Sequence, residues 1–159
     1  MISAFKQMPP LAKLWVYAAN RKLTDQEQVQ IMLDGESFIS EWTAHQQQLK
    51  ASFGIVYDTF IVICVDENYN QVSGCGIDKS VHFLQQLEIK YQLDLFNRMQ
   101  IELWLDENVL MINKQKLAAM IQAGTANDKT QMFNKRITTK QEFDVQFLIT
   151  VDQSWLYPA

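Results

Sequence analysis

Apolar and polar residues alternate along Lys13–Ala19, and this period of two predicts the first β-strand. A helix should begin just after Thr24, because Thr24 and Glu27 have the spacing of a capping box, in which each side chain bonds the backbone N–H of the other residue. Apolar residues at helical spacing continue to about His45. Gly35, inside this helix, either weakens it or allows another segment of the chain to approach closely.

A β-hairpin is predicted from Ala51–Tyr57 and Phe60–Val65, with a tight turn around Asp58. The second of these strands is apolar at nearly every position, so we expect it to be central and buried on both faces. A second amphipathic helix follows the loop "SGCGID", and Asp78 is its expected N-cap. The apolar face of this helix consists of Ile77, Val81, Leu84, Leu87 and Tyr91.

The C-terminal third of the chain contains weaker patterns. Gln100–Leu105 and Val109–Ile112 alternate and predict a second hairpin. A short helix should span residues 114–123 and end at Gly124. Residues 125–140 are polar and are predicted as a loop, before a last strand near Val145–Val151.

The predicted order of strand, helix, strand, strand, helix, strand is that of a ferredoxin-like βαββαβ sandwich. We therefore predict an α+β fold in a single domain over residues 1–159, with a core of about residues 11–112 and a C-terminal strand/helix extension of about residues 113–159. In such a sandwich the third strand, Phe60–Val65, fills the gap between the first two and lies in the middle of the antiparallel sheet.

The same topology places the loops that follow the first and third strands at opposite ends of the sheet. Residues 19–23, which include Arg21, should therefore be far from residues 73–78, which include Cys75. Asp106 and Glu107 should lie at the end that holds Cys75.

The composition indicates which classes of protein and partner are compatible with the chain. Hydrophobic residues make up 48% of the chain and charged residues 20%, which is typical of a folded globular domain. The formal net charge of −4 argues against a nucleic-acid partner, and no apolar run approaches the ~20 residues of a membrane span. We expect a cytoplasmic protein in which Cys64 and Cys75 are reduced thiols.

Cys75 is the residue most suggestive of chemistry, since a thiol near a helix N-terminus is activated by the backbone amides. Against this, Asp78 would oppose a thiolate, and a sharp turn requires flanking glycines for backbone reasons alone. The neighbouring polar residues form a candidate ligand-binding loop, although asparagines are common in simple turns, which is the interpretation we favour. The candidate ligand-binding residues of this loop are Asn68, Tyr69, Asn70, Ser73, Cys75 and Asp78.

A second candidate site consists of Asn20, Arg21 and Arg98, which could hold an anion at a helix N-terminus or could simply form a solvated basic patch. No P-loop or complete dinucleotide fingerprint is present, and His45 and His82 lack the spacing of a helical metal pair. We therefore expect no cofactor and no metal site.

Several stretches of the chain resemble a family of short, uncharacterised bacterial proteins, some of which carry the label ABC transporter ATPase. The resemblance covers most of the chain and rests on "WVYAANRKLT", "LKASF", "DENYNQVSGCGIDKSV", "FNR" and "QSWL". Because the chain lacks a Walker sequence, the resemblance implies no ATP binding.

These observations favour a small noncatalytic module that binds an unknown small ligand or another protein. The alternative is a thiol-dependent or anion-handling enzyme that uses the Cys75 loop or the end with Asn20, Arg21 and Arg98. Homo-oligomerisation through a sheet face or edge is a further possibility, because small α+β sandwiches often leave a sheet surface in need of cover.

Overall fold

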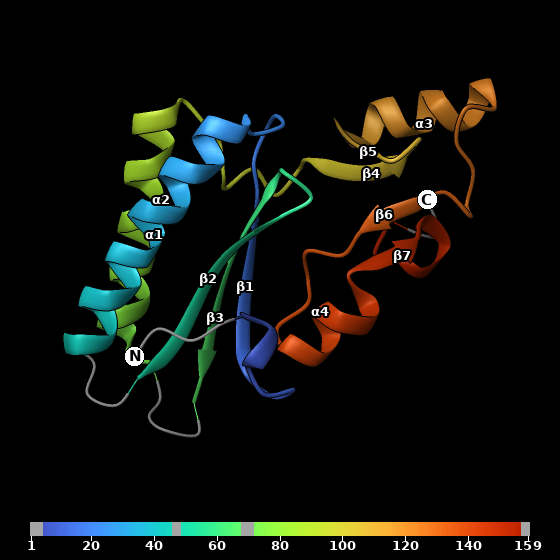
Figure 1. The fold of residues 1–159 in the computed structure, drawn as a ribbon. Helices are drawn as coiled ribbons and strands as arrows, with labels where there is room; N and C mark the ends of the chain where they lie inside the picture. Colours follow the sequence, from blue (N-terminus) through green and yellow to red (C-terminus); the bar gives the residue numbers. More distant parts are fainter. Residues whose placement is uncertain (1–4, 46–48, 68–71, 157–159) are drawn as a thin grey trace.

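Two antiparallel sheets form the framework of the protein in the computed structural model, which describes residues 5–45, 49–67 and 72–156. The strand orders are β1-β3-β2 in the first sheet and β5-β4-β6-β7 in the second (Figure 1). The α+β class is therefore confirmed, and helices accompany both sheets.

The first sheet consists of β1 (Lys13–Ala18), β2 (Lys50–Val56) and β3 (Phe60–Asp66). Strand β3 is buried along its whole length and pairs antiparallel with both neighbours, so its predicted central position is confirmed. The continuous apolar character of β3 therefore reports burial on both faces, as it does in other buried strands.

Helices α1 (Asp25–His45) and α2 (Gly74–Tyr91) cover one face of the first sheet. The capping box at the start of α1 is confirmed, because the Glu27 N–H donates to Thr24 Oγ1 at 3.1 Å and the Thr24 N–H donates to Glu27 Oε1 at 2.9 Å. Gly35 marks a close approach, since a Cβ at this position would lie 2.3 Å from the Phe53 ring of β2. Helix α1 therefore lies directly on β2.

The second sheet departs from the ferredoxin-like prediction. Its first strand, β4, pairs with β5 and β6, whereas a ferredoxin-like sandwich requires it to pair with β1. The prediction is thus wrong for the fourth strand. The bounds of the elements in this part are β4 Ile101–Leu105, β5 Asn108–Ile112, α3 Lys114–Ala123, β6 Gln131–Phe133, α4 Lys140–Gln146 and β7 Leu148–Thr150, with 3-10 turns η1 at Phe5–Gln7 and η2 at Val151–Gln153.

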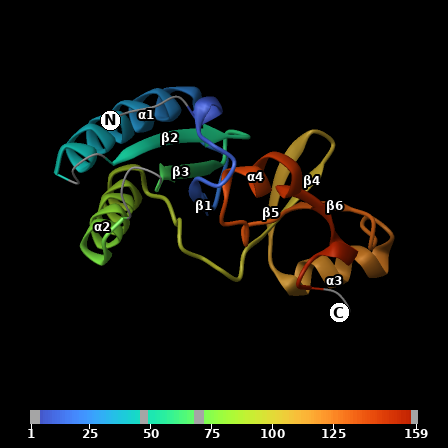
Figure 2. The same cartoon turned by 90° about the horizontal axis from the view of Figure 1, so that it is seen from below.

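The need to cover the other face of the first sheet explains this departure. That face presents Leu14, Phe60, Val62 and Cys64, all fully or nearly fully buried. Figure 2 shows that α4 and the second sheet lie on the side of the first sheet opposite α1 and α2. Aromatic residues of the C-terminal part, such as Phe147, complete this core. A sheet with two apolar faces needs a layer on each side, which the C-terminal part supplies.

The predictions for residues 125–151 are wrong in two places. The expected loop contains β6, and the expected strand Val145–Val151 is divided between the end of α4 and β7. Helix α4 begins at a signal that the hydrophobic pattern obscured, because Thr139 and Glu142 repeat the spacing of a capping box. The Thr139 hydroxyl indeed accepts a hydrogen bond from the Glu142 N–H.

The loops at the two ends of the first sheet lie far apart, as predicted. Arg21 donates to the carbonyl of Tyr91 at the C-terminal end of α2, whereas Cys75 lies at its N-terminal end, roughly 24 Å away at 1.5 Å per residue. The position predicted for Asp106 and Glu107 is wrong, because they form the β4–β5 turn in the second sheet.

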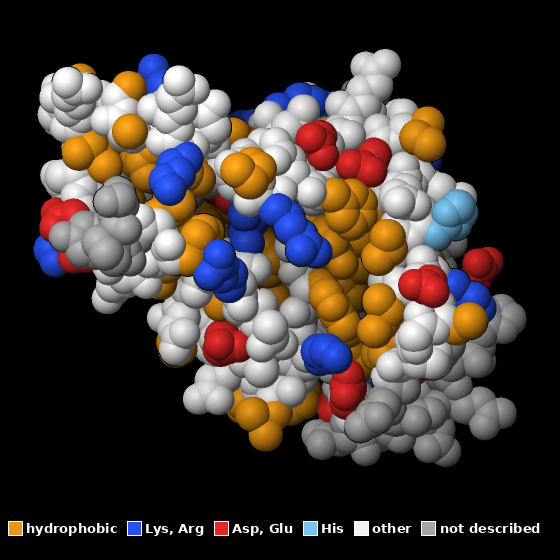
Figure 3. All heavy atoms as spheres, turned by 180° about the vertical axis from the view of Figure 1, so that it is seen from behind, with side chains coloured by type: hydrophobic (Ala, Val, Ile, Leu, Met, Phe, Trp, Pro, Cys, Tyr) orange, Lys and Arg blue, Asp and Glu red, His pale blue; other side chains and the backbone are white. Residues whose placement is uncertain are grey.

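Figure 3 shows the rear of the molecule, where hydrophobic side chains gather in a strip between the half covered by helices and the half built on the second sheet. The rear edge strand of the first sheet is β1, and its Trp15 and Tyr17 are half-buried against the core beneath the helices. No helix in the described part of the chain is long and apolar enough to cross a membrane.

Candidate functional site

Helix α2 begins earlier than the sequence predicts, and this moves Cys75 into its first turn. The N-cap is Ser73, whose Oγ accepts from the Gly76 N–H at 3.0 Å, so the prediction of Asp78 as N-cap is wrong. Glycines are poor helix formers, but the Trp42 indole N–H donates to the Gly76 carbonyl at 3.0 Å and holds this turn against α1.

A groove of about 780 Å³ runs between α1 and α2. The rings of Phe38 and Phe83 stack across it, with 4.4 Å between their centroids and an angle of 6° between their planes. Phe38 also stacks on Trp42 at 5.3 Å. The α1–α2 groove therefore has an aromatic centre, to which α1 contributes Phe38 and Trp42 and the antiparallel α2 contributes Phe83.

Charged side chains lie at both ends of the α1–α2 groove. At one end Asp34 accepts hydrogen bonds from Lys90 Nζ at 2.9 Å and from the Tyr91 hydroxyl at 2.6 Å. Burial alone would raise the pKa of Asp34, but these two hydrogen bonds lower it below its usual value, so the carboxylate stays charged. At the other end lie Cys75, Asp78, Lys79 and His82, all exposed.

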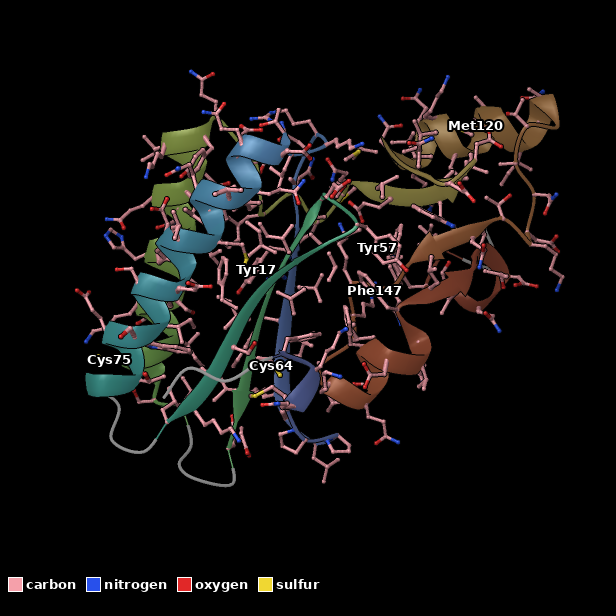
Figure 4. All side chains as sticks on the ribbon, viewed as in Figure 1. Tyr17, Tyr57, Cys64, Cys75, Met120 and Phe147 are labelled. Atoms are coloured by element: carbon pink, nitrogen blue, oxygen red, sulfur yellow. The ribbon has the colours of Figure 1, made fainter. Side chains whose placement is uncertain are left out.

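Cys75 and Asp78, which sequence analysis placed in one site, both line the α1–α2 groove. Figure 4 shows Cys75 at the end of the helical layer, far from the labelled residues between the two sheets. His82 lies two helical turns from Cys75, a rise of about 10 Å, so its ring cannot bond the thiol. It instead contacts Gln86 Nε2 at 3.3 Å. A cysteine–histidine pair is therefore not formed here.

The other residues of the predicted loop contribute less to this site. Ser73 caps α2, as described above. Asn68, Tyr69 and Asn70 lie outside the described residues.

In the candidate anion site, Arg21 is already bonded to other groups of the protein. The Arg21 guanidinium forms a two-pronged ion pair with Glu27, at 2.8 and 2.7 Å, and also bonds the Tyr91 carbonyl. The hydrogen bond from Arg21 lowers the pKa of Glu27 to about 2, so this carboxylate occupies the helix N-terminus where an external anion was expected. Asn20 accepts from the Asp94 N–H, and Arg98 is exposed to solvent.

A buried charge pair lies where the first sheet meets the second. Glu102 on β4 is fully buried, and its Oε2 accepts from Lys135 at 3.0 Å and from Gln100 at 2.8 Å. Burial raises the pKa of Glu102, although the nearby Lys135 acts in the opposite direction. The described residues contain no group of three or more possible metal ligands, here or elsewhere.

Sequence analysis did not foresee the aromatic centre of the α1–α2 groove. The available signal was the spacing of Phe38 and Trp42, which are four residues apart and therefore neighbours on one side of α1. Phe38, Trp42 and Phe83 extend the apolar surface of the two helices from the part that faces the sheet into the groove.

Comparison with known proteins identifies no relative of this chain. No family model, curated protein or solved structure matches the chain.

Proposed function

We propose that this protein is a small noncatalytic binding module that takes a largely apolar, aromatic small molecule in the α1–α2 groove. The observation that carries the proposal is the groove itself. Its volume of about 780 Å³ falls within the range of roughly 300–1,000 Å³ that is usual for small-molecule sites. Its stacked rings offer a ligand a rigid apolar surface.

The polar groups around the α1–α2 groove fit a role in orientation. At one end, the Asp34 carboxylate already bonds Lys90 and the Tyr91 hydroxyl, so these side chains are held in fixed positions. At the other end, the side chains of Glu41 and Lys79 line the groove, and neither forms a hydrogen bond or ion pair with another described residue. A ligand with an apolar body and one polar end would place that end beside them, as in most ligand sites.

The absence of a base near the thiol favours binding over catalysis. Among the described residues, no histidine or other base is hydrogen-bonded to the Cys75 thiol, and His82 contacts Gln86 instead. The exposed position of Cys75 in the first turn of α2 is the observation that favours a thiol-dependent enzyme. Turnover of any thioester or disulfide substrate that disappears in Cys75→Ala would establish that second function.

The neutral fluorophore N-phenyl-1-naphthylamine is a suitable probe, because its fluorescence rises in apolar surroundings and it carries no charge. We expect saturable binding at one site per chain. Ser37→Trp, which fills the α1–α2 groove from its wall, should reduce the affinity at least tenfold, or about 1.4 kcal/mol. Gln26→Trp, an exposed position of α1 outside the groove, is the matched control and should bind like the wild type.

The Cys75→Ser variant separates the two functions. A binding module should retain its affinity for the probe, because the thiol lies at the rim and not among the stacked rings. Unsaturable binding, or equal affinity in wild type and Ser37→Trp, would refute the proposed site.

A further inference from the structure

The charged side chains that line the α1–α2 groove do not cancel. They belong to Asp34, Glu41, Asp78, Lys79 and Lys90. At one end of the groove Asp34 and Lys90 neutralise each other, since Lys90 Nζ donates to Asp34 Oδ2 at 2.9 Å. Two carboxylates and one ammonium group remain at the other end. With histidine counted as neutral, the lining of the groove therefore carries one excess negative charge.

The contact between the two helices places the remaining three charges at one level of the groove. The Trp42 indole of α1 bonds the Gly76 carbonyl of α2, which shows where the two antiparallel helices meet (Figure 1). Glu41 is the neighbour of Trp42 in the chain, and Asp78 and Lys79 follow closely after Gly76. Because one helical turn contains 3.6 residues, all three charged residues lie within about one turn of this hydrogen bond.

The excess negative charge does not depend on how these side chains pair with one another. Among the described residues, the side chains of Glu41, Asp78 and Lys79 form no hydrogen bond or ion pair. The single ammonium group of Lys79 can neutralise one of the two carboxylates, so the other is left for a ligand. The helix dipoles add little, because the last turns of α1 lie beside the first turn of α2 and their opposite partial charges offset each other.

The aromatic centre of the groove lies close to this charged end. Glu41 is three residues from Phe38, a rise of about 4.5 Å, and Asp78 is five residues from Phe83, a rise of about 7.5 Å. A ring that packs against the stacked side chains therefore needs only a short spacer to bring a polar group to these carboxylates. An ammonium group there would complement the excess charge, whereas a carboxylate group would meet two like charges.

We infer that the ligand of the α1–α2 groove is an aromatic amine, whose ring packs against Phe38 and Phe83 and whose ammonium group lies beside Glu41 and Asp78. This inference rests on the proposed function, because it assigns a chemical class to the small molecule that the groove takes. It adds the sign of the ligand's charge and the end of the groove at which that charge lies.

Three indoles that carry a two-carbon arm on the same ring separate the effect of charge from that of shape. They are tryptamine, which is a cation, 3-ethylindole, which is neutral, and indole-3-propionate, which is an anion. Their affinities are measured by displacement of N-phenyl-1-naphthylamine at low ionic strength and about pH 8, where histidine is neutral.

We expect tryptamine to bind about threefold more tightly than 3-ethylindole, and indole-3-propionate about threefold more weakly, since this is the usual strength of an exposed charge interaction. Both differences should shrink in about 0.5 M sodium chloride, because salt screens exposed charges.

The two carboxylates can be removed one at a time and together. Glu41→Gln and Asp78→Asn preserve the size of exposed side chains, so the fold should be retained. The readout is the ratio of the affinities for tryptamine and indole-3-propionate within each variant. Each single variant should abolish the preference for tryptamine, and the double variant should reverse it, because only Lys79 then remains charged. Glu36→Gln is the matched control, since it removes an exposed carboxylate of α1 outside the groove and should keep the wild-type ratio.

Equal affinities for the three indoles in the wild type, or tighter binding of indole-3-propionate, would overturn the inference. A double variant that kept the wild-type ratio would overturn it as well, because the preference would then arise elsewhere. In these cases N-phenyl-1-naphthylamine still binds, so the proposed function stands. If N-phenyl-1-naphthylamine does not bind the wild type at all, the proposed function fails, and the inference fails with it.

Discussion

Gly35→Ala tests the contact that sets the position of α1, and with it one wall of the α1–α2 groove. The added methyl group would lie 2.3 Å from Cδ1 and Cε1 of the Phe53 ring and 2.6 Å from its Cγ. Phe53 is only 7% exposed and its ring also contacts Phe83, so it has little room to move. Either the ring or the whole of α1 must shift.

The magnitude follows from two opposing effects. Alanine is favoured over glycine inside a helix by about 1 kcal/mol. Forcing an extra methyl group into a well-packed core costs about 1–3 kcal/mol, and the very short contact at Gly35 places this variant at the upper end. We therefore expect a net loss of about 1–2 kcal/mol in the free energy of unfolding.

Urea denaturation followed by circular dichroism measures this loss. With a slope of about 2 kcal/mol per molar urea, the midpoint should fall by about 0.5–1 M. Gly74→Ala, in the first turn of α2, is the matched control, because a Cβ there meets nothing within 4 Å. If Gly35→Ala were as stable as the wild type or more so, α1 could not lie on Phe53 as described.

Two further predictions concern buried groups. Lys135→Met should lower the free energy of unfolding by about 3 kcal/mol at pH 8, since it leaves the buried Glu102 carboxylate without its ion-pair partner. Burial raises the pKa of Glu102, so the folded state holds the proton of this carboxyl group more tightly than the unfolded state, and the loss of unfolding free energy should be smaller at pH 5. Equal losses at pH 5 and pH 8, measured by urea denaturation, would contradict this account. Iodoacetamide should alkylate the exposed Cys75 in the native protein but should alkylate Cys64 only after urea unfolds the chain, because burial raises the pKa of Cys64 to about 12. If mass spectrometry found both thiols alkylated in the native protein, the result would contradict the burial of β3.

The first half of the fold could be predicted because its signals are local and strong. The alternation of β1, the capping box at Thr24 and the continuous apolar run of β3 each reflect one physical requirement, and the structure meets all three. Gly35 was ambiguous in the sequence, because only the three-dimensional structure reveals that Phe53 lies against it.

The second half could not be predicted in the same way, because its pairing depends on contacts distant in sequence. Strand β4 alternates like a strand of the first sheet, and nothing within it reveals that it pairs with β6 about thirty residues later. Helix α4 was missed in the sequence because Val145–Val151 resembles a strand, although the spacing of Thr139 and Glu142 is that of a helix start.

The candidate site was predicted only at its rim. Cys75 and Asp78 were identified from a loop pattern, and both line the α1–α2 groove. The rings that give the groove its character, Phe38, Trp42 and Phe83, come from two helices that meet only in the folded chain. Sequence reasoning finds such a site when its residues share one motif, and here they do not.

The indole N–H of Trp42 provides the most direct test of the proposed binding site, because this ring lines the α1–α2 groove and donates its hydrogen bond to Gly76. Titration of ¹⁵N-labelled protein with N-phenyl-1-naphthylamine should shift the Trp42 indole resonance in a saturable way. The indole resonance of Trp104, which lies in the aromatic cluster between the two sheets, should stay in place. Saturable shifts at Trp104 with none at Trp42 would contradict the account.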